Sequence, residues 1–153
     1  MIIIGIDPDV DKNGVAEIDG EVMQVSAMKF APLIYYLNDK NSVVDIIVLI
    51  EAGWLNQYNW HLYSRMTIQK AAQIGNATGR NHEVGRKIAE MCEYNNIPYK
   101  FIKPLKKVWK GRDGKITAQE FEKFTGLRGR TNQEMRDAGL IAFLYKHNLD
   151  IVK

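Results

Sequence analysis

The first third of the chain alternates short apolar runs with polar turns, a pattern that predicts three strands. Residues 2–6 are apolar and mostly β-branched, and this strand should end at Asp7 because the following proline disfavours helix. Two further runs, 15–18 and 22–27, flank an Asp-Gly dipeptide at 19–20, which supplies the positive φ angles of a tight hairpin turn. We therefore expect three strands that are antiparallel neighbours.

The next apolar stretches predict a helix and two more strands. Residues 32–37 favour a first helix. Residues 43–50 are apolar with little interruption, which is typical of a strand covered on both faces, and Glu51 follows at its C-terminal end. Residues 98–102 predict another strand. Strands followed by a helix–strand alternation indicate an α/β fold, with a mixed five-stranded sheet and helices on both faces.

The segment 61–95 has helical periodicity. The glycines between 75 and 79 predict a break into two helices. On the second of these, Val84, Ile88 and Cys92 follow one another at helical spacing. Cys92 should therefore belong to the core rather than to a catalytic site.

The last third of the chain predicts an exposed loop and two closing helices. Residues 103–115 combine lysines with glycines, which is typical of an exposed loop. Thr117 with Glu120, and Thr131 with Glu134, each have the spacing of a capping box, in which the hydroxyl and the carboxylate satisfy N–H groups of a first helical turn. We expect one helix to begin at each pair.

Length and composition narrow the class of protein. A chain of 153 residues without repeat or linker predicts one domain over 1–153, and 46% hydrophobic residues argue against disorder. The apolar runs are too short to cross a bilayer, and no secretory signal is expected. A single cysteine excludes an internal disulfide and a multi-cysteine zinc site. We expect a cytoplasmic protein without a membrane partner.

Charge is distributed unevenly along the chain, although the formal net charge is only +3. Residues 1–60 hold three Lys and Arg against nine Asp and Glu, a net charge of −6, whereas residues 61–115 hold twelve against four, a net charge of +8. A basic block of this kind suggests a polyanionic partner; a solvated charged face is the alternative.

Four acidic residues form the candidate site. Asp7 and Glu51 end two predicted buried strands, and ligands gather at strand ends in such sheets. Two carboxylates on neighbouring strands repel each other unless a cation lies between them. Glu134 and Asp137 are three residues apart at the start of the last helix and share one face. An all-oxygen set suits Mg²⁺, with Mn²⁺ as a substitute, better than zinc.

These residues resemble the RuvC-type Holliday junction resolvases, a family with the ribonuclease H-like fold. The resemblance rests on IGIDP at 4–8 with Gly14 following, on VLIE at 48–51, and on EMRDA at 134–138. It extends over nearly the whole chain in the same order. The chain is similar to a divergent or phage-type member, because Asp9 and Glu134 stand where the family commonly has glycine and aspartate.

The resemblance implies a two-metal nuclease acting on branched DNA. It assigns Asp7, Glu51, Glu134 and Asp137 both a catalytic and a metal-binding role, with Mg²⁺ as the cofactor and Asp7 between the two ions. The substrate it implies is a four-way junction, whose two-fold symmetry is matched most simply by a homodimer. The family also places basic residues before its last helices, here Lys103, Lys106, Lys107, Lys110 and Lys115.

An aromatic segment follows Glu51. Trp54, Tyr58 and Trp60 stand in a stretch that is otherwise polar. The side chains of Trp54 and Tyr58 either anchor the segment to the core or stack on unpaired bases beside the acids. We count both among the candidate nucleic-acid-binding residues.

Three other functions remain to be weighed. A ribonuclease H-like nuclease on RNA–DNA hybrids would need the same acids, so the acids alone do not separate the two activities. A non-catalytic nucleic-acid-binding protein is disfavoured by the presence of all four acids. An actin-like kinase also begins with a strand ending in aspartate, but that fold needs two domains and glycine-rich phosphate loops, which this chain lacks.

Overall fold

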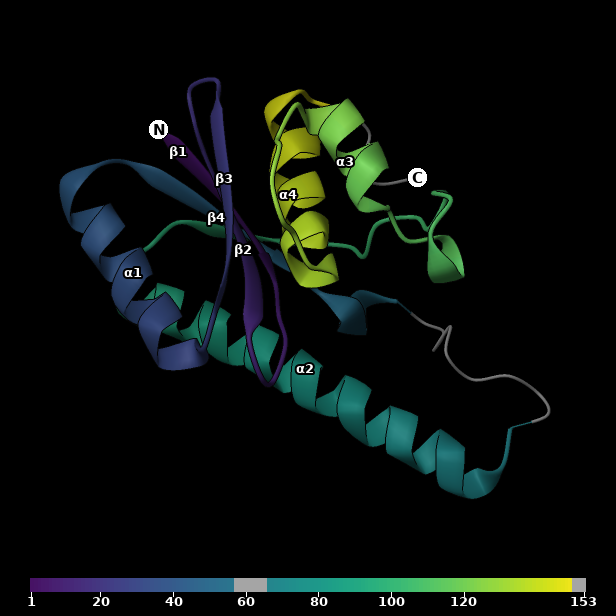
Figure 1. Cartoon of the computed structure of the whole chain (residues 1–153). Coiled ribbons are helices and arrows are strands. Elements are labelled where there is room, and N and C mark those ends of the chain that lie inside the picture. The colour runs from purple at the N-terminus through teal and green to yellow at the C-terminus, as the bar shows by residue number, and fades with distance from the viewer. Residues whose placement is uncertain (57–65, 150–153) are drawn as a thin grey trace.

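A five-stranded mixed sheet forms the centre of the molecule (Figure 1). The computed structural model describes residues 1–56 and 66–149. The strands lie in the order β3-β2-β1-β4-β5, and their bounds are β1 Ile2–Asp7, β2 Asn13–Asp19, β3 Val22–Met28, β4 Ile46–Glu51 and β5 Tyr99–Ile102. Strands β1, β2 and β3 pair antiparallel, whereas β4 runs parallel to β1 and β5 parallel to β4. The predicted α/β fold is confirmed.

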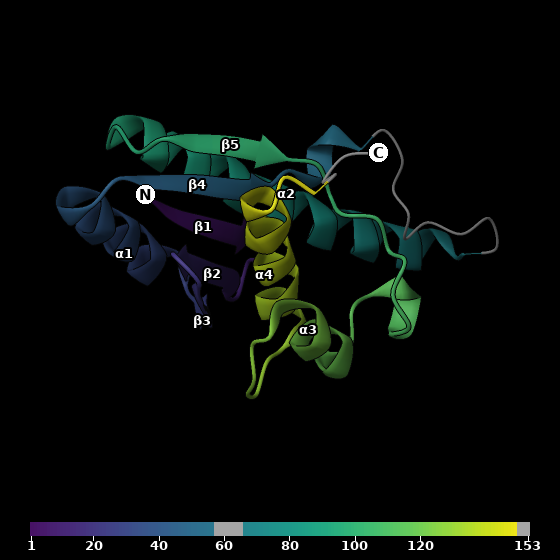
Figure 2. The same ribbon diagram turned by 90° about the horizontal axis from the view of Figure 1, so that it is seen from above.

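Helices cover both faces of the sheet. Their bounds are α1 Phe30–Val43, α2 Ile68–Tyr94, α3 Ala118–Thr125 and α4 Gln133–Lys146, with short 3-10 turns η1 Gly53–Leu55 and η2 Arg112–Gly114. Helices α1 and α2 lie on one face, and α4 lies on the other with α3 beside it (Figures 1 and 2). The first face carries the largest apolar cluster, in which β1, β4, α1 and α2 all contribute side chains.

The hairpin between β2 and β3 differs by one residue from the prediction. Asp19 is still part of β2 and pairs with Val22, so the turn consists of Gly20 and Glu21. Of these, Gly20 takes the positive φ, at +56°. Only the glycine of the predicted Asp-Gly dipeptide therefore has the unusual backbone conformation.

Helix α2 is one continuous helix of 27 residues, so the predicted break near its glycines is wrong. A side chain at Gly75 or Gly79 would meet open space, and a glycine in a helix interior costs only about 1 kcal/mol relative to alanine. The packed C-terminal half, with Ile88 and Cys92 fully buried, holds the helix in place. The prediction that Cys92 is a core residue is confirmed.

The two predicted capping boxes have different outcomes. Thr117 and Glu120 form a complete capping box at the start of α3, as predicted. Helix α4 instead begins after Asn132, whose side chain accepts a hydrogen bond from the Met135 backbone N–H. The Thr131 hydroxyl accepts a hydrogen bond from the Arg136 side chain. The carboxylate of Glu134 is therefore not used in a capping box.

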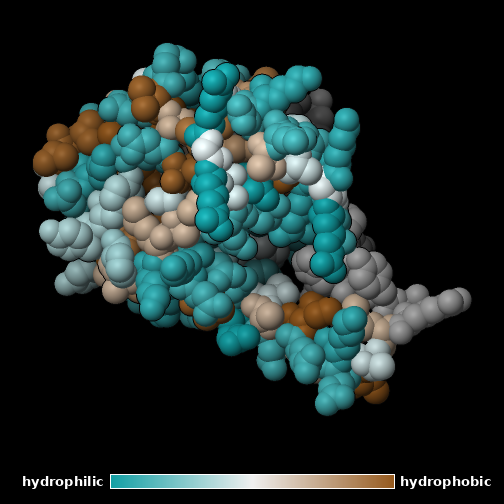
Figure 3. All heavy atoms as spheres, viewed as in Figure 1, coloured by the Kyte–Doolittle hydropathy of each residue, from teal (hydrophilic) through white to brown (hydrophobic). Residues whose placement is uncertain are grey.

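Hydrophilic side chains cover most of the face of the molecule shown in Figure 3. Within residues 1–56 and 66–149, no helix combines the length and the apolar character needed to cross a membrane.

Candidate active site

Asp7 and Glu51 lie side by side at one edge of the sheet. Ile6 is in register with Ile50 on the parallel strand, so the two acids that follow are neighbours. Side chains alternate between the faces of a strand, and Ile6 and Ile50 both point into the core under α1 and α2. Asp7 and Glu51 therefore both point to the opposite face, where α4 lies.

Helix α4 approaches this face very closely because glycines stand beneath it. A Cβ at Gly5 would overlap the carbonyl of Ala138, and a Cβ at Gly14 would overlap the carbonyl of Glu134. Gly14 is the cross-strand partner of Asp7. The missing side chains on the sheet thus set the first turn of α4 directly beside Asp7.

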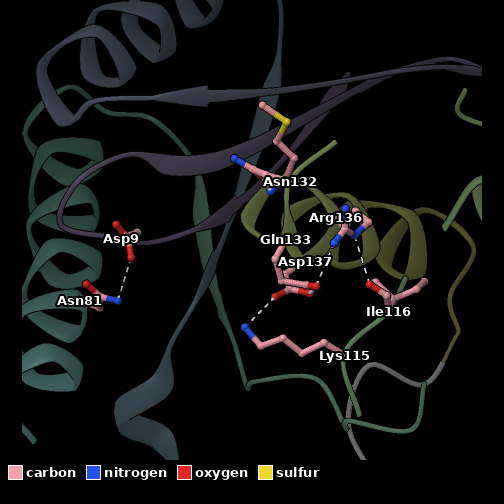
Figure 4. A network of polar contacts seen from close by, with 9 residues as sticks. Asp9, Asn81, Lys115, Ile116, Asn132, Gln133, Arg136 and Asp137 are labelled. Carbon is pink, nitrogen blue, oxygen red and sulfur yellow. Dashed lines mark hydrogen bonds and ion pairs between the residues drawn. The ribbon is translucent and has the colours of Figure 1, made fainter. Parts of the chain in front are cut away.

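Asp137 is the acid that α4 contributes to the cluster. Its Oδ1 accepts a hydrogen bond of 2.7 Å from the Gln133 side chain, and its Oδ2 lies 3.9 Å from Nζ of Lys115 (Figure 4). Its negative charge raises the pKa of Asp7 and of Glu51. Three elements, β1, β4 and α4, therefore bring three carboxylates within electrostatic reach of one another.

The pKa values of these carboxyls reflect burial and mutual repulsion. Burial, followed by the charges of Glu51 and Asp137, raises the pKa of Asp7 well above its ordinary value. Burial and then Asp137 raise the pKa of Glu51 to about 7. Burial also raises the pKa of Asp137, against the opposing effects of Gln133 and Lys115. Burial is the largest cause for each acid, and the charges of neighbouring acids add to it.

Glu134 lies at the margin of this cluster. Its backbone packs on Gly14, and its charge raises the pKa of Asp7 and Asp137 less than the other groups that act on them. The rival explanation for its position, a capping box with Thr131, is removed by the Asn132 cap. A metal-binding role for Glu134 stays a prediction.

The donor set fits a hard divalent cation. Asp7, Glu51 and Asp137 offer only carboxylate oxygens, which Mg²⁺ and Mn²⁺ prefer, and their raised pKa values mark a place where added positive charge is favourable. In the described part of the chain, no three His, Cys, Asp or Glu side chains already converge into a metal-binding group.

The basic loop between β5 and α3 is folded rather than extended. The Trp109 N–H donates to the Gly114 carbonyl, and the Gly111 N–H donates to the Lys115 carbonyl. Two of its lysines act on the acids, because Lys107 and Lys115 both lower the pKa of Glu51. The other predicted DNA-binding lysines, Lys103, Lys106 and Lys110, are exposed.

Arg136 is a residue that the sequence did not single out. Its guanidinium donates to the Ile116 carbonyl at 3.1 Å and to the Gln133 side chain at 3.0 Å (Figure 4). It also donates to the Thr131 carbonyl at 2.9 Å. It thereby ties the end of the basic loop to the first turn of α4, next to Asp137. The sequence could have indicated a role for Arg136 in the site only through its position between Glu134 and Asp137 in one helical turn.

Asp9 serves the turn that follows Asp7. Its carboxylate accepts a hydrogen bond from the side chain of Asn81 on α2 (Figure 4). It also accepts one from the Asp11 N–H, and the Asn81 side chain accepts one from the Val10 N–H. These contacts give Asp9 a structural role in the turn. They fasten the turn to α2.

Trp54 packs between α2 and β5. A Cβ at Gly85 would stand 2.8 Å from the indole ring, and the ring lies edge-on to Phe101 at a centroid distance of 5.1 Å. The guanidinium of Arg86 lies 5.0 Å from the ring centroid. These contacts give Trp54 an anchoring role, and its stacking on bases stays a prediction. Tyr58, the other predicted stacking residue, lies outside the described residues.

The structure is similar to that of a RuvC protein. The structure described as T. thermophilus RuvC in complex with Holliday junction substrate matches with a TM-score of 0.52 at 14% identity, covering 97% of each chain. A second structure, of Thermus thermophilus RuvC, matches with a TM-score of 0.47 at 14% identity, covering 97% of this chain and 98% of that one. No family model and no curated protein matches the chain. The chain has a RuvC-like, ribonuclease H-like fold.

Proposed function

We propose that the protein is a metal-dependent endonuclease that cleaves phosphodiester bonds in four-way or other branched DNA. The observation that carries the proposal is that Asp7, Glu51 and Asp137, from three separate elements, lie within electrostatic reach of one another and each have a raised pKa. Perturbed carboxylates gathered at one sheet edge are typical of functional sites rather than of packing. The fold adds support, because a protein of the same fold has been solved with a Holliday junction.

In this mechanism the carboxylates position the cofactor and the lysines position the substrate. Two Mg²⁺ ions, when bound, would supply an activated water and stabilise the leaving oxygen. Asp7 lies between Glu51 and the first turn of α4, so it would hold the metal together with the acids on either side. Glu51 and Asp137 would each hold one side, and Glu134 would complete the set. No covalent intermediate is needed, so no serine or cysteine nucleophile is required.

The basic loop would bind the phosphates on either side of the cut. Lys107 and Lys115 act electrostatically on the acids, so they lie close enough to the site to contact a phosphate bound there. Lys103, Lys106 and Lys110 are exposed further along the loop and would hold neighbouring phosphates without reading base sequence. Cleavage of two opposed strands of a junction would be completed by a second copy of the chain in a two-fold homodimer.

The experiment compares three labelled substrates and two variants. A four-way junction, a plain duplex and an RNA–DNA hybrid are incubated with the protein, with and without Mg²⁺. Asp7→Asn should abolish junction cleavage but retain junction binding, because it removes a metal ligand together with a charge that repels phosphate. Asp39→Asn, at an exposed position of α1, is the matched control and should cleave normally.

Each contrary outcome changes the proposal in a specific way. If Asp7→Asn retains more than about a tenth of the wild-type rate, a loss below about 1.4 kcal/mol, Asp7 does not hold the metal. Preferential cutting of the hybrid would identify a ribonuclease H-like activity instead. Tight junction binding without any cutting in Mg²⁺ or Mn²⁺ would identify a non-catalytic binding protein.

A further inference from the structure

Lys115 places an ammonium group among the acids. Its Nζ lies 3.9 Å from Oδ2 of Asp137, and its side chain is only 39% exposed despite its position in a loop. A lysine of an ordinary solvated loop would extend into water. This one points toward Asp137 (Figure 4).

The loop backbone is built to hold this lysine. The Lys115 carbonyl accepts from the Gly111 N–H, and the Lys115 N–H donates to the Arg112 carbonyl. A Cβ at Gly111 would overlap the Lys115 carbonyl, so the close turn depends on that glycine. The backbone of Lys115 is therefore held by its own loop through both its N–H and its carbonyl.

The next residue is fastened to the helix that carries Asp137. Ile116 is fully buried, and its carbonyl accepts a hydrogen bond from the Arg136 guanidinium. Arg136 precedes Asp137 in the same helical turn. The backbone positions of Lys115 and Asp137 are thus tied by a contact between the residues adjacent to them, independently of the ion pair itself.

The ammonium acts on the whole cluster rather than on one acid. Lys115 lowers the pKa of Asp7, of Glu51 and of Asp137, against burial, which raises all three. Lys107 lowers the pKa of Glu51 only. Of the two lysines, Lys115 is the cation that all three acids share.

We propose that the Lys115 ammonium is the internal counter-ion of the acid cluster when no metal is bound, and that a divalent cation entering the cluster displaces it. The proposal rests on the metal site of the proposed function. A lysine suits this exchange because its charge is compact and its four-carbon stem is flexible, so the ammonium can leave while the backbone stays in place. Once displaced, it stands beside the metal site, where it can contact a phosphate of bound DNA.

The test measures metal binding through protein stability, without DNA and without activity. Melting temperatures of the wild type, Lys115→Met and Lys106→Met are recorded in EDTA and then across a titration with Mg²⁺ and with Mn²⁺. Lys106 is an exposed lysine of the same loop and serves as the matched control. Lys115→Arg is added as a variant that retains the positive charge.

Lys115→Met should melt at a lower temperature than the wild type in EDTA, because three close carboxylates lose their shared cation. Its rise in melting temperature with Mg²⁺ or Mn²⁺ should exceed that of the wild type, and its half-saturating metal concentration should fall by about fivefold or more, the effect of removing a competitor worth about 1 kcal/mol. Lys106→Met should match the wild type. Lys115→Arg should retain the stability in EDTA.

Equal metal responses of Lys115→Met and Lys106→Met would overturn the proposal, and so would a wild type that no divalent ion stabilises. If Lys115→Met does not fold in EDTA, the wild type is used with ¹⁵N-labelled lysine, whose Lys115 side-chain signal should shift at the metal concentration that saturates the site; an unmoved signal overturns the proposal. A protein that shows the expected metal competition but cuts no DNA would overturn the proposed function alone.

Discussion

The backbone of Glu134 rests directly on Gly14, with no room for even a methyl group between them. Gly14 is also the residue paired with Asp7 across β1 and β2. One glycine therefore connects the acid of the first strand to the helix turn that carries the last two acids. The backbone positions from which these acids project are therefore held by a direct backbone contact.

We predict that Gly14→Ala separates the two halves of the site. The added Cβ would overlap the Glu134 carbonyl, so either β2 or α4 must shift. Overpacking of this kind costs about 1–3 kcal/mol, and the shift moves Asp137 away from Asp7. A lower melting temperature together with a weaker response to Mg²⁺ is expected. Normal stability and normal metal response would show that α4 can be displaced without consequence for the acids.

Gly75→Ala, unlike Gly14→Ala, should stabilise the protein. Gly75 lies inside α2, it is exposed, and an added Cβ would meet open space. Alanine is favoured over glycine in a helix interior by about 1 kcal/mol, so the variant should be more stable than the wild type. Denaturant unfolding measures the difference. A reduced stability would mean that the helix is not continuous at this residue.

The metal-free protein should become less stable as the pH rises. The pKa of Glu51 is raised from 4.5 to about 7, so between these values the folded protein keeps a proton that the unfolded chain has released. Stability falls with pH wherever the folded state binds more protons. Asp7 and Asp137 shift in the same direction.

Thermal melts in EDTA from pH 5 to pH 8 test this expectation. The melting temperature should decline across the range, and Asp7→Asn should reduce the decline because one repelling charge is removed. Saturating Mg²⁺ should largely abolish it, since the ion compensates the ionised carboxylates. A melting temperature in EDTA that stays level or rises between pH 5 and pH 8 would contradict the raised pKa of Glu51.

The strand-end acids could be predicted from sequence because their signal is local. A buried apolar run that ends at Asp7, and another that ends at Glu51, determine which residues stand at the sheet edge. Strand alternation then gives the face on which they point. The first of the two capping boxes was predictable for the same reason, since Thr117 and Glu120 satisfy each other within one turn.

The remaining features depend on contacts between distant residues. The hydrogen bond from Arg136 to Ile116 joins residues 20 positions apart, and no local sequence pattern predicts it. The break expected in α2 was wrong because glycine disfavours a helix by a small free energy that packing elsewhere outweighs. The choice of Asn132 over Thr131 as the cap of α4 likewise follows from Arg136, which binds the Thr131 side chain.

Replacing Lys106 and Lys110 together by alanine should flatten the salt dependence of junction binding. Both side chains are exposed, and the backbone N–H of Lys110 that bonds to Glu120 is retained in alanine. Each phosphate that the variant no longer neutralises should reduce the slope of log affinity against log salt by about 0.9 on duplex arms. A salt titration followed by fluorescence anisotropy measures the slope. An unchanged slope would mean that these lysines only solvate the loop.

Substitutions of Trp54 test whether this side chain stabilises the fold or binds DNA. The indole packs on Gly85 and against Phe101, and Arg86 lies over its ring, so the side chain already has partners within the protein. Trp54→Ala should therefore reduce the free energy of unfolding by somewhat less than the roughly 3–5 kcal/mol that truncation of a fully buried tryptophan costs, and the melting temperature should fall with it. Trp54→Phe should restore part of the lost stability.

The same variants separate anchoring from stacking on DNA. If Trp54 only anchors, 2-aminopurine placed at the crossover of a junction should report the same opening with wild-type and Trp54→Ala protein, measured where both are folded. A base stacked on the ring would contribute about 1–3 kcal/mol, so removing the ring would reduce the opening signal and the cleavage rate together. The contacts with Gly85 and Phe101 lead us to expect an unchanged signal. A reduced signal at unchanged stability would instead assign Trp54 to the DNA.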